Sequence, residues 1–347
     1  MDEVGDISHW LADGDMVYSR AMDEMQKQIE SFAQDADRIA EQVQRVIVGQ
    51  EGVVDEVIAV LLAGGHALLE GVPGVGKTML VRSLAGALHL TCARVQFTPD
   101  LMPADITGTD ILVQQESGKK QFEFQPGPIF ANLILADEIN RATPKTQSAI
   151  LEAMQEGTVS IARTTHKLPS PFVVLATQNP IDMEGTYPLP EAQMDRFCMK
   201  IRVPNPSAEQ IAEILARTCG ADAPEVQAVV DATRLAEMKA LVRLVPVAEH
   251  LTRAVAKLIA TSHPDHPDAP AIVKQYVKLG ASPRGAQSIL LTARVAALRA
   301  GRASVSTDDL AAQVVPCLRH RLLLNFEAHA KQITSETILD ELVKSIG

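Results

Sequence analysis

One stretch constrains this chain more than any other, and it runs from Leu68 to Leu80 as "LLEGVPGVGKTML". It fits the pattern G-x-x-x-x-G-K-[ST], with an apolar run before it and a segment of helical periodicity after it. Glycines let such a loop wrap around a phosphate and aim backbone N–H groups at it, and the following helix adds partial positive charge. We therefore expect a strand, a phosphate-binding loop and a helix. The residues expected to contact nucleotide are Gly71, Val72, Pro73, Gly74, Val75, Gly76, Lys77, Thr78 and Met79.

A second stretch, Leu133–Ala142, reads "LILADEINRA" and supplies what a phosphate loop alone lacks. Its apolar run is typical of a buried strand, so Asp137 and Glu138 are expected at the carboxyl end of a parallel strand, where open α/β sheets bind ligands. Lys77 would contact the β- and γ-phosphates, while Thr78 and Asp137 would hold Mg²⁺. Glu138 would polarise the attacking water. The two stretches together predict hydrolysis of a nucleoside triphosphate.

Three polar residues further along the chain are candidates for the same chemistry. Asn179 ends the apolar run "FVVLATQNP", where it could orient the water near Glu138. Arg196 lies just before another apolar strand, at a place from which a cation would reach a neighbouring subunit's nucleotide. Arg284 follows Pro283 at the start of a helix. Each also has a structural reading, as a turn cap, a surface ion pair and a first-turn residue, so the phosphate loop is what favours catalytic roles.

The order of segment types predicts the architecture. From Ile47 to about Pro204, strand-like and helix-like segments alternate, which indicates a parallel sheet covered by helices. From Ser207 onward amphipathic helices take over. We expect an α/β fold in three parts: a helical arm over residues 1–45, a nucleotide-binding core over 46–205 and an all-helical lid over 206–347.

Two β-hairpins are expected within the core. Residues 110–127 read "DILVQQESGKKQFEFQPG", with a turn at Ser117 and Gly118, and residues 158–172 read "TVSIARTTHKLPSPF". Lys119 and Lys120 at the first tip could contact an acidic substrate or simply be solvated. Near the end of the chain, the basic segment "LRHRL" could reach an adjacent subunit or form a solvated turn.

The N-terminal arm carries a heptad stripe, which predicts a long helix. Its flanking positions offer no complementary charges to specify a coiled-coil partner. We therefore favour a helix packed on its own nucleotide-binding core or on a neighbouring subunit over a self-standing coiled coil. The apolar positions of the stripe are Met22, Met25, Ile29, Phe32, Ala36, Ile39, Val43 and Val46.

Charge and cysteine content exclude some functions. Residues 1–45 hold 11 acidic and 4 basic residues, a net of −7, so the rest carries only −4 of the total −11. The body therefore lacks the basic surface typical of tight nucleic-acid binding, and nucleic acid is not expected as a partner.

The four cysteines lack metal-type spacing and are expected to be reduced and mostly buried. With no leader or membrane-spanning run evident, we expect a cytoplasmic protein that does not bind membranes.

The order of these motifs closely resembles the MoxR family of AAA+ ATPases, over about residues 46–325. The resemblance rests on "VIVGQ", the phosphate loop, "QFTPDLMPADITG", "LADEINRATPKTQSAILEAMQEGTV", "ATQNP", "EGTYPLPEAQMDRF" and "GASPRGAQ". By that resemblance Lys77 and Thr78 correspond to Walker A, Asp137 and Glu138 to Walker B, Asn179 to sensor 1, Arg196 to the arginine finger and Arg284 to sensor 2. Val48 and Gly49 would line the adenine pocket, and the two hairpins would be the helix-2 insert and the pre-sensor-1 hairpin, projecting toward a ring pore.

The resemblance implies a function as well as a fold. It implies Mg²⁺-dependent ATP hydrolysis by a ring, expected to be a hexamer, that acts as a chaperone-like remodelling or maturation factor for a partner complex. A partner with a von Willebrand factor A domain is implied by the family and by no residue of this chain. The alternatives are a magnesium-chelatase-like ATPase subunit, a DNA-translocating AAA+ motor and a non-hydrolysing nucleotide-gated scaffold.

Overall fold

A five-stranded parallel sheet forms the centre of the structure, a computed structural model that describes residues 8–114, 120–162, 164–180, 185–219 and 224–344. The strand order is β2-β5-β8-β1-β9, and every neighbouring pair is parallel. The central strands β5, β8 and β1 therefore end side by side at one edge of the sheet. The strands are β1 (Ala67–Glu70), β2 (Cys92–Gln96), β5 (Leu133–Asp137), β8 (Val173–Gln178) and β9 (Met199–Arg202).

Side chains from the central strands alternate between two hydrophobic cores, one on each face of the sheet. Leu69, Leu135 and Leu175 belong to one core, whereas their neighbours Leu68 and Ile134 belong to the other. Because successive strand residues point to opposite faces, a strand buried on both faces reads as a continuous apolar run, as in residues 133–137. Helices α2 (Glu51–Ala63) and α3 (Lys77–Ala87) contribute to the first core, and α4 (Pro103–Thr107) and α5 (Pro144–Glu156) to the second.

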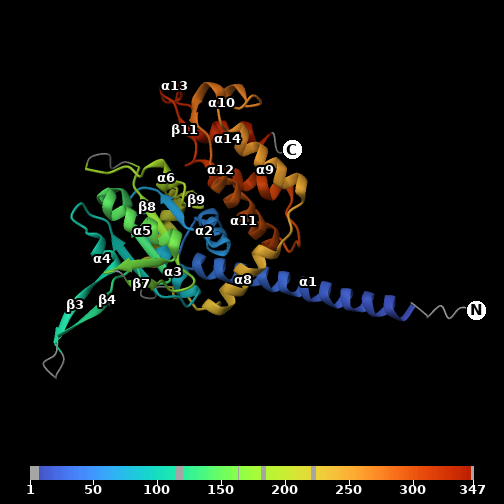
Figure 1. The fold of residues 1–347 in the computed structure, drawn as a ribbon, viewed down its shortest axis with the longest axis horizontal. Helices are drawn as coiled ribbons and strands as arrows, with labels where there is room; N and C mark the ends of the chain where they lie inside the picture. Colours follow the sequence, from blue (N-terminus) through green and yellow to red (C-terminus); the bar gives the residue numbers. More distant parts are fainter. Residues whose placement is uncertain (1–7, 115–119, 163, 181–184, 220–223, 345–347) are drawn as a thin grey trace, which may run out of the picture.

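Helix α1 (Ser8–Gln44) packs its C-terminal half on the rest of its own chain, while its N-terminal turns extend beyond the body (Figure 1). Ile29, Phe32, Ile39 and Val43 are fully buried, and the helix contacts α2, α3 and α11. Asp35 forms an ion pair with Arg234, 2.8 Å away. The expected helix is therefore present, and its stripe packs on its own chain from Ile29 onward, whereas Met25 is exposed.

Both expected hairpins are present. Strands β3 (Gly108–Gln114) and β4 (Lys120–Pro126) pair antiparallel, and Figure 1 shows this hairpin projecting from the body. Strands β6 (Thr158–Ile161) and β7 (Thr164–Lys167) form the second hairpin. The Phe124 ring on β4 stacks on His166 of β7 at 4.0 Å between ring centroids, which joins the two hairpins. The predicted turn at residues 117–118 and Lys119 lie outside the described residues.

The C-terminal region is helical, with one addition to the expected pattern. Two short strands, β10 (Val277–Leu279) and β11 (Leu323–Leu324), pair antiparallel between the helices. Helix α6 (Glu191–Met194) lies between β8 and β9. The helices that follow β9 are α7 (Ala208–Thr218), α8 (Ala232–Leu244), α9 (Glu249–Thr261), α10 (Ala271–Tyr276), α11 (Pro283–Arg299), α12 (Thr307–Leu318), α13 (Phe326–Ala330) and α14 (Ser335–Val343).

The structure bears on two expectations drawn from composition, the burial of the cysteines and the lack of a membrane-spanning segment. Cys198 and Cys317 are buried thiols, but Cys92 and Cys219 are exposed, so the expectation of burial holds for only half of the cysteines. Across the described ranges, no helix combines the length and apolarity needed to span a bilayer.

Candidate functional site

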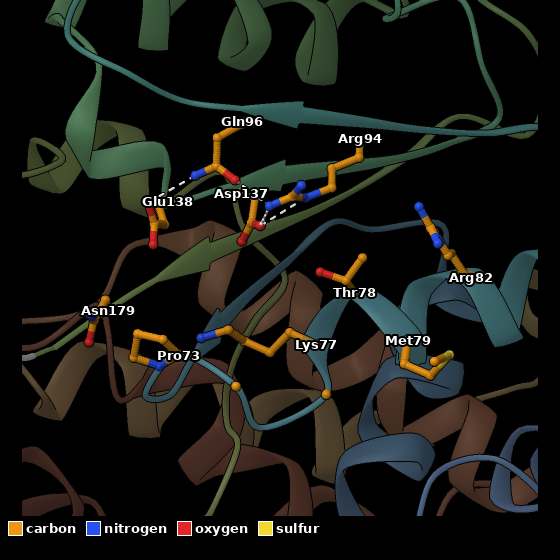
Figure 2. A pocket seen from close by; sticks show the side chains of 12 residues that line it. Pro73, Lys77, Thr78, Met79, Arg82, Arg94, Gln96, Asp137, Glu138 and Asn179 are labelled. Atoms are coloured by element: carbon orange, nitrogen blue, oxygen red, sulfur yellow. Dashed lines mark hydrogen bonds and ion pairs between the residues drawn. The ribbon is translucent and has the colours of Figure 1, made fainter. Parts of the chain in front are cut away.

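A cavity of about 440 Å³ opens at the carboxyl edge of the sheet (Figure 2). Its walls come from the loop between β1 and α3, from β2 and from the ends of β5 and β8. Sequence segments more than 100 residues apart therefore meet at one place, as the strand order requires. The residues that line the cavity are Pro73, Gly74, Gly76, Lys77, Thr78, Met79, Arg82, Arg94, Gln96, Asp137, Glu138 and Asn179.

Glycines shape the loop at three positions for two different reasons. Gly74 and Gly76 both have φ of +85°, in the left-handed region that side chains disfavour, and open space lies beside them. A Cβ on Gly71 would lie 2.9 Å from the carbonyl oxygen of Val203, so close packing excludes a side chain there. Helix α3 begins at Lys77 directly after this loop, which directs its N-terminus at the cavity.

Lys77 reaches back over the loop that precedes it. Its Nζ donates to the carbonyl oxygens of Gly71 and Val72, the latter at 3.2 Å. Burial lowers the pKa of Lys77, while the nearby carboxylates Asp137 and Glu138 act in the opposite direction. The ammonium group is therefore partly desolvated, and an anionic ligand at this place would satisfy it better than two carbonyls do.

Asp137 ends β5 with both carboxylate oxygens in hydrogen bonds. Its Oδ1 accepts from the Thr177 hydroxyl at 2.6 Å, and its Oδ2 accepts from Arg94 Nη2 at 2.7 Å and Nε at 3.0 Å. The Thr78 hydroxyl group lines the same cavity. Hard oxygen donors of this kind, with substrate phosphates, suit Mg²⁺. The donor set fits a magnesium ion, with Arg94 as the group that competes for the carboxylate.

Glu138 follows in a strained backbone position, with φ of +56°. Its backbone N–H donates to the Thr177 hydroxyl, at 2.8 Å. Its Oε2 accepts from Gln96 Nε2 at 2.8 Å and from Arg141 Nη1 at 2.9 Å. A carboxylate held by two donors is restrained in the direction it faces. Figure 2 shows the hydrogen bond between the Glu138 carboxylate and Gln96 at the end of β2.

Asn179 lies where the sequence predicts, at the end of β8 and in the wall of the cavity. Val48 and Gly49 do not line it. Val48 is buried, and the Gly49 carbonyl accepts from Gln210 Nε2 at 3.3 Å. The neighbouring Gln50 donates to the Val75 carbonyl at 2.8 Å, which ties this segment to the phosphate loop.

The two remaining candidates, Arg196 and Arg284, line a different cavity of about 250 Å³. It lies where the end of the sheet region meets the C-terminal helices, and Arg243 and Arg321 share its walls. Arg196 Nη1 donates to the Leu151 carbonyl at 2.7 Å. Arg284 does start helix α11, as predicted, and its Nη1 lies 3.8 Å from Asp195.

Residues that the sequence reasoning missed surround the carboxylates. Arg94, Gln96, Thr177 and Arg141 contact Asp137 or Glu138, and Arg82 lines the cavity. For Gln96 a signal existed in the strand polarity, because Gln96 ends β2 and the carboxyl ends of parallel strands share one sheet edge. The basic segment "LRHRL" is also different from either expectation: His320 and Arg321 are buried within the chain, with exposed fractions of 7% and 8%.

A parallel sheet in this order, a phosphate loop entering α3 and paired carboxylates at the end of β5 define an AAA+ ATPase. Comparison with known proteins agrees. Residues 66–199 match the model of the ATPase family associated with various cellular activities, and residues 269–342 match the AAA lid domain. With its relatives below, the chain belongs to the MoxR family of AAA+ ATPases.

The relatives extend over most of the chain. It is 42% identical over 306 residues to the chaperone MoxR1 of Mycobacterium tuberculosis, covering 88% of this chain and 80% of that protein. It is 30% identical to the protein MoxR of Methylorubrum extorquens, covering 87% and 92%. The crystal structure of a candidate ATPase from Cytophaga hutchinsonii superposes with a TM-score of 0.87 at 36% identity, covering 95% and 98%.

Proposed function

We propose that the chain hydrolyses ATP with Mg²⁺ in a ring, where each nucleotide lies between the phosphate-loop cavity of one subunit and the arginine-lined cavity of the next. One observation carries the proposal: Arg196 and Arg284 line a cavity that excludes Lys77, Asp137 and Glu138. A single subunit thus divides its catalytic groups between two places. A ring brings them together, because each subunit offers a different cavity to each neighbour.

In this proposal the chain's own residues divide the reaction between them. The phosphate loop and Lys77 bind the β- and γ-phosphates, and α3 directs its N-terminus at them. Glu138 turns from Gln96 to orient and polarise the attacking water, with Asn179 beside it. Arg196 and Arg284 of the neighbouring subunit stabilise negative charge that develops on the γ-phosphate. Thr78 and Asp137 would hold Mg²⁺, which supplies electrostatic stabilisation of the phosphate oxygens when bound.

The wider role follows the relatives. We propose a hexameric ring that acts as a chaperone-like remodelling factor for a partner complex, with a von Willebrand factor A protein as its docking partner. We keep the division into an arm over residues 1–45, a core over 46–205 and a lid over 206–347. The adenine role of Val48 and Gly49 and a cytoplasmic location also stay predictions.

The test of hydrolysis is steady-state phosphate release from Mg-ATP by the full chain, compared with the Glu138→Gln variant. That variant keeps the hydrogen-bonding shape but removes the charge that polarises water. We expect its turnover to fall by about 100-fold or more while ATP binding is retained. Equal turnover in the two proteins, or no turnover in either, would overturn the enzymatic proposal and favour a nucleotide-gated scaffold.

The test of the partner uses the same variant, because Glu138→Gln holds ATP without consuming it. Proteins that co-purify with it from lysate of the source organism are compared with those recovered by Lys77→Ala. Enrichment of a von Willebrand factor A protein in the ATP-bound form alone supports the proposed partner. Recovery of nucleic acid, or stimulation of hydrolysis by DNA, would favour a motor instead.

A further inference from the structure

Arg321 is the centre of a buried polar network beside the arginine-lined cavity. Its side chain is 2% exposed. Four of its hydrogen bonds reach the segment 195–198, which contains Arg196: Nε donates to Asp195 Oδ1 at 2.8 Å, Nη2 to the Asp195 and Phe197 carbonyls at 3.0 and 2.7 Å, and Nη1 to the Cys198 carbonyl at 3.1 Å. One C-terminal side chain therefore holds the backbone on both sides of Arg196.

Asp195 connects the same segment to Arg284. Its Oδ1 accepts from the Ser282 hydroxyl at 2.6 Å as well as from Arg321. Ser282 in turn caps helix α11 by accepting the backbone N–H of Arg284, at 3.2 Å. The Arg284 guanidinium lies 3.8 Å from Asp195 Oδ2. The carboxylate next to Arg196 thus contacts the turn that begins Arg284's helix and Arg284 itself.

Helices α11 and α12 and the segment 195–198 pack closely together. A Cβ on Gly285 would lie 2.6 Å from Leu318 Cδ2 and 3.2 Å from Arg321 Cδ, so the start of α11 and the end of α12 are in direct contact. His320 also binds the Phe197 carbonyl through Nε2, at 3.1 Å. A buried guanidinium is costly to desolvate, and apolar residues would pack such a place at least as stably. The burial of Arg321 is therefore better explained by a role other than stabilising the fold.

We propose that Asp195 and Arg321 are positioning residues that lock Arg196 and Arg284 into one unit, so that both guanidinium groups meet a single anion together. The proposal rests on the proposed function, which takes that anion to be the nucleotide of the neighbouring subunit. The two arginines then face that nucleotide in a fixed relation to each other.

The first test is the turnover of the full chain with Asp195→Asn. This variant keeps the shape and the Oδ1 acceptor but removes the charge between Arg284 and Arg321. We expect kcat to fall by about tenfold or more, with the KM for ATP and the binding of ATP changed less than about twofold. The matched control is Glu191→Gln, which neutralises an exposed carboxylate four residues earlier, and its kcat should stay within about twofold of the unsubstituted chain.

A milder variant covers the case in which Asp195→Asn fails to fold. Ser282→Ala removes the hydrogen bond from the cap of α11 to Asp195 but leaves the pairs of Asp195 with Arg284 and Arg321, and we expect kcat to fall by about threefold. The proposal is overturned if kcat stays unchanged in the folded variants. It is also overturned if kcat falls only in proportion to a fall in melting temperature, because that pattern indicates a purely structural role.

Mixing subunits separates this proposal from the proposed function. Asp195→Asn leaves its own nucleotide cavity intact, so mixing it with Glu138→Gln should give more hydrolysis than the two separate proteins together. No recovery in that mixture, while Arg196→Ala mixed with Glu138→Gln does recover, overturns the positioning role alone. If neither mixture recovers although mixed rings form, the division of the site between subunits is wrong and both proposals fall.

Discussion

The two cavities differ most in how their charges are balanced. In the phosphate-loop cavity each carboxylate already has a cationic partner, with Arg94 on Asp137 and Arg141 on Glu138. In the arginine-lined cavity, among the described residues that form its walls, Asp195 is the sole acid beside Arg196, Arg284 and their neighbours. The first cavity can rearrange its own charges, whereas the second holds an excess of positive charge that an outside anion would compensate.

Removing the anchor of the first cavity should have the largest effect. Lys77→Ala removes the cation that we propose binds the β- and γ-phosphates, so we expect ATP affinity to fall by about 100-fold or more and hydrolysis to disappear. Titration calorimetry with ATP measures the affinity, and Lys120→Ala on the β4 strand serves as a control for the loss of one lysine. ATP affinity retained in Lys77→Ala would mean that the phosphates bind elsewhere.

Removing Arg196, the proposed arginine finger of the second cavity, should leave ATP binding intact but slow hydrolysis. We expect Arg196→Ala to reduce kcat by about 1000-fold with little change in ATP affinity, because in our proposal the guanidinium acts on charge that develops in the transition state. Mixed with Glu138→Gln subunits, it should regain activity. If Arg196→Ala instead abolished ATP binding by its own subunit, the contrast between the two cavities would be wrong.

A smaller effect should come from the restraint on Glu138. Gln96→Ala removes one of the two donors on the carboxylate, at a cost of about 1 kcal/mol for such a hydrogen bond. We expect kcat to rise by about threefold, because Glu138 is freer to turn toward water. Gln125→Ala on the projecting hairpin is the matched control. A fall in kcat would show that Gln96 positions Glu138 for the reaction and does not restrain it.

The last prediction concerns stability and involves His66, in the wall of the second cavity. Its effect on the free energy of unfolding should be small at neutral pH and clear in acid. Its Nδ1 accepts the Val174 N–H, so the proton must lie on Nε2, which donates to the Met154 carbonyl. Burial lowers the pKa of His66 to about 4 from 6.5. The unfolded chain therefore binds a proton that the folded chain excludes, and stability is lost as the pH falls below about 6.5.

The size of this acid effect can be measured. Between pH 7 and pH 5 we expect the free energy of unfolding to fall by about 2 kcal/mol through His66, with His320 adding in the same direction because burial also lowers its pKa. Urea titrations at the two pH values measure the fall, and His66→Gln should reduce it. An equal fall in His66→Gln and in the unsubstituted chain would place the acid sensitivity elsewhere.

The sequence predicted those parts of the site that depend on local pattern and on strand polarity. The loop from Gly71 to Thr78 and the polar ends of β5 and β8 meet because parallel strands end at one edge of the sheet. Arg94 and Gln96 escaped prediction because their partners depend on strand order. Only the pairing of β2 with β5, with Gln96 opposite Asp137, brings them to the carboxylates.

Arg321 illustrates a second limit of reading from sequence. A run of basic residues reads as a solvated turn because charges are seldom buried. Its burial depends on carbonyl acceptors more than 120 residues away, in the segment 195–198, which no local pattern reveals. The separation of Arg196 and Arg284 from Lys77 is of the same kind, since it depends on how the helical region packs on the sheet.

Helix α1 has a practical consequence for cutting the chain into fragments. The stretch matched by the AAA family model begins at residue 66, yet Ile29, Phe32, Ile39 and Val43 lie in the same core as the sheet. A fragment trimmed to residues 66–199 would expose the apolar surface on which α1 and α2 pack, and would be prone to aggregate. A fragment designed to fold should therefore include α1 and α2 as well as the residues that match the family model.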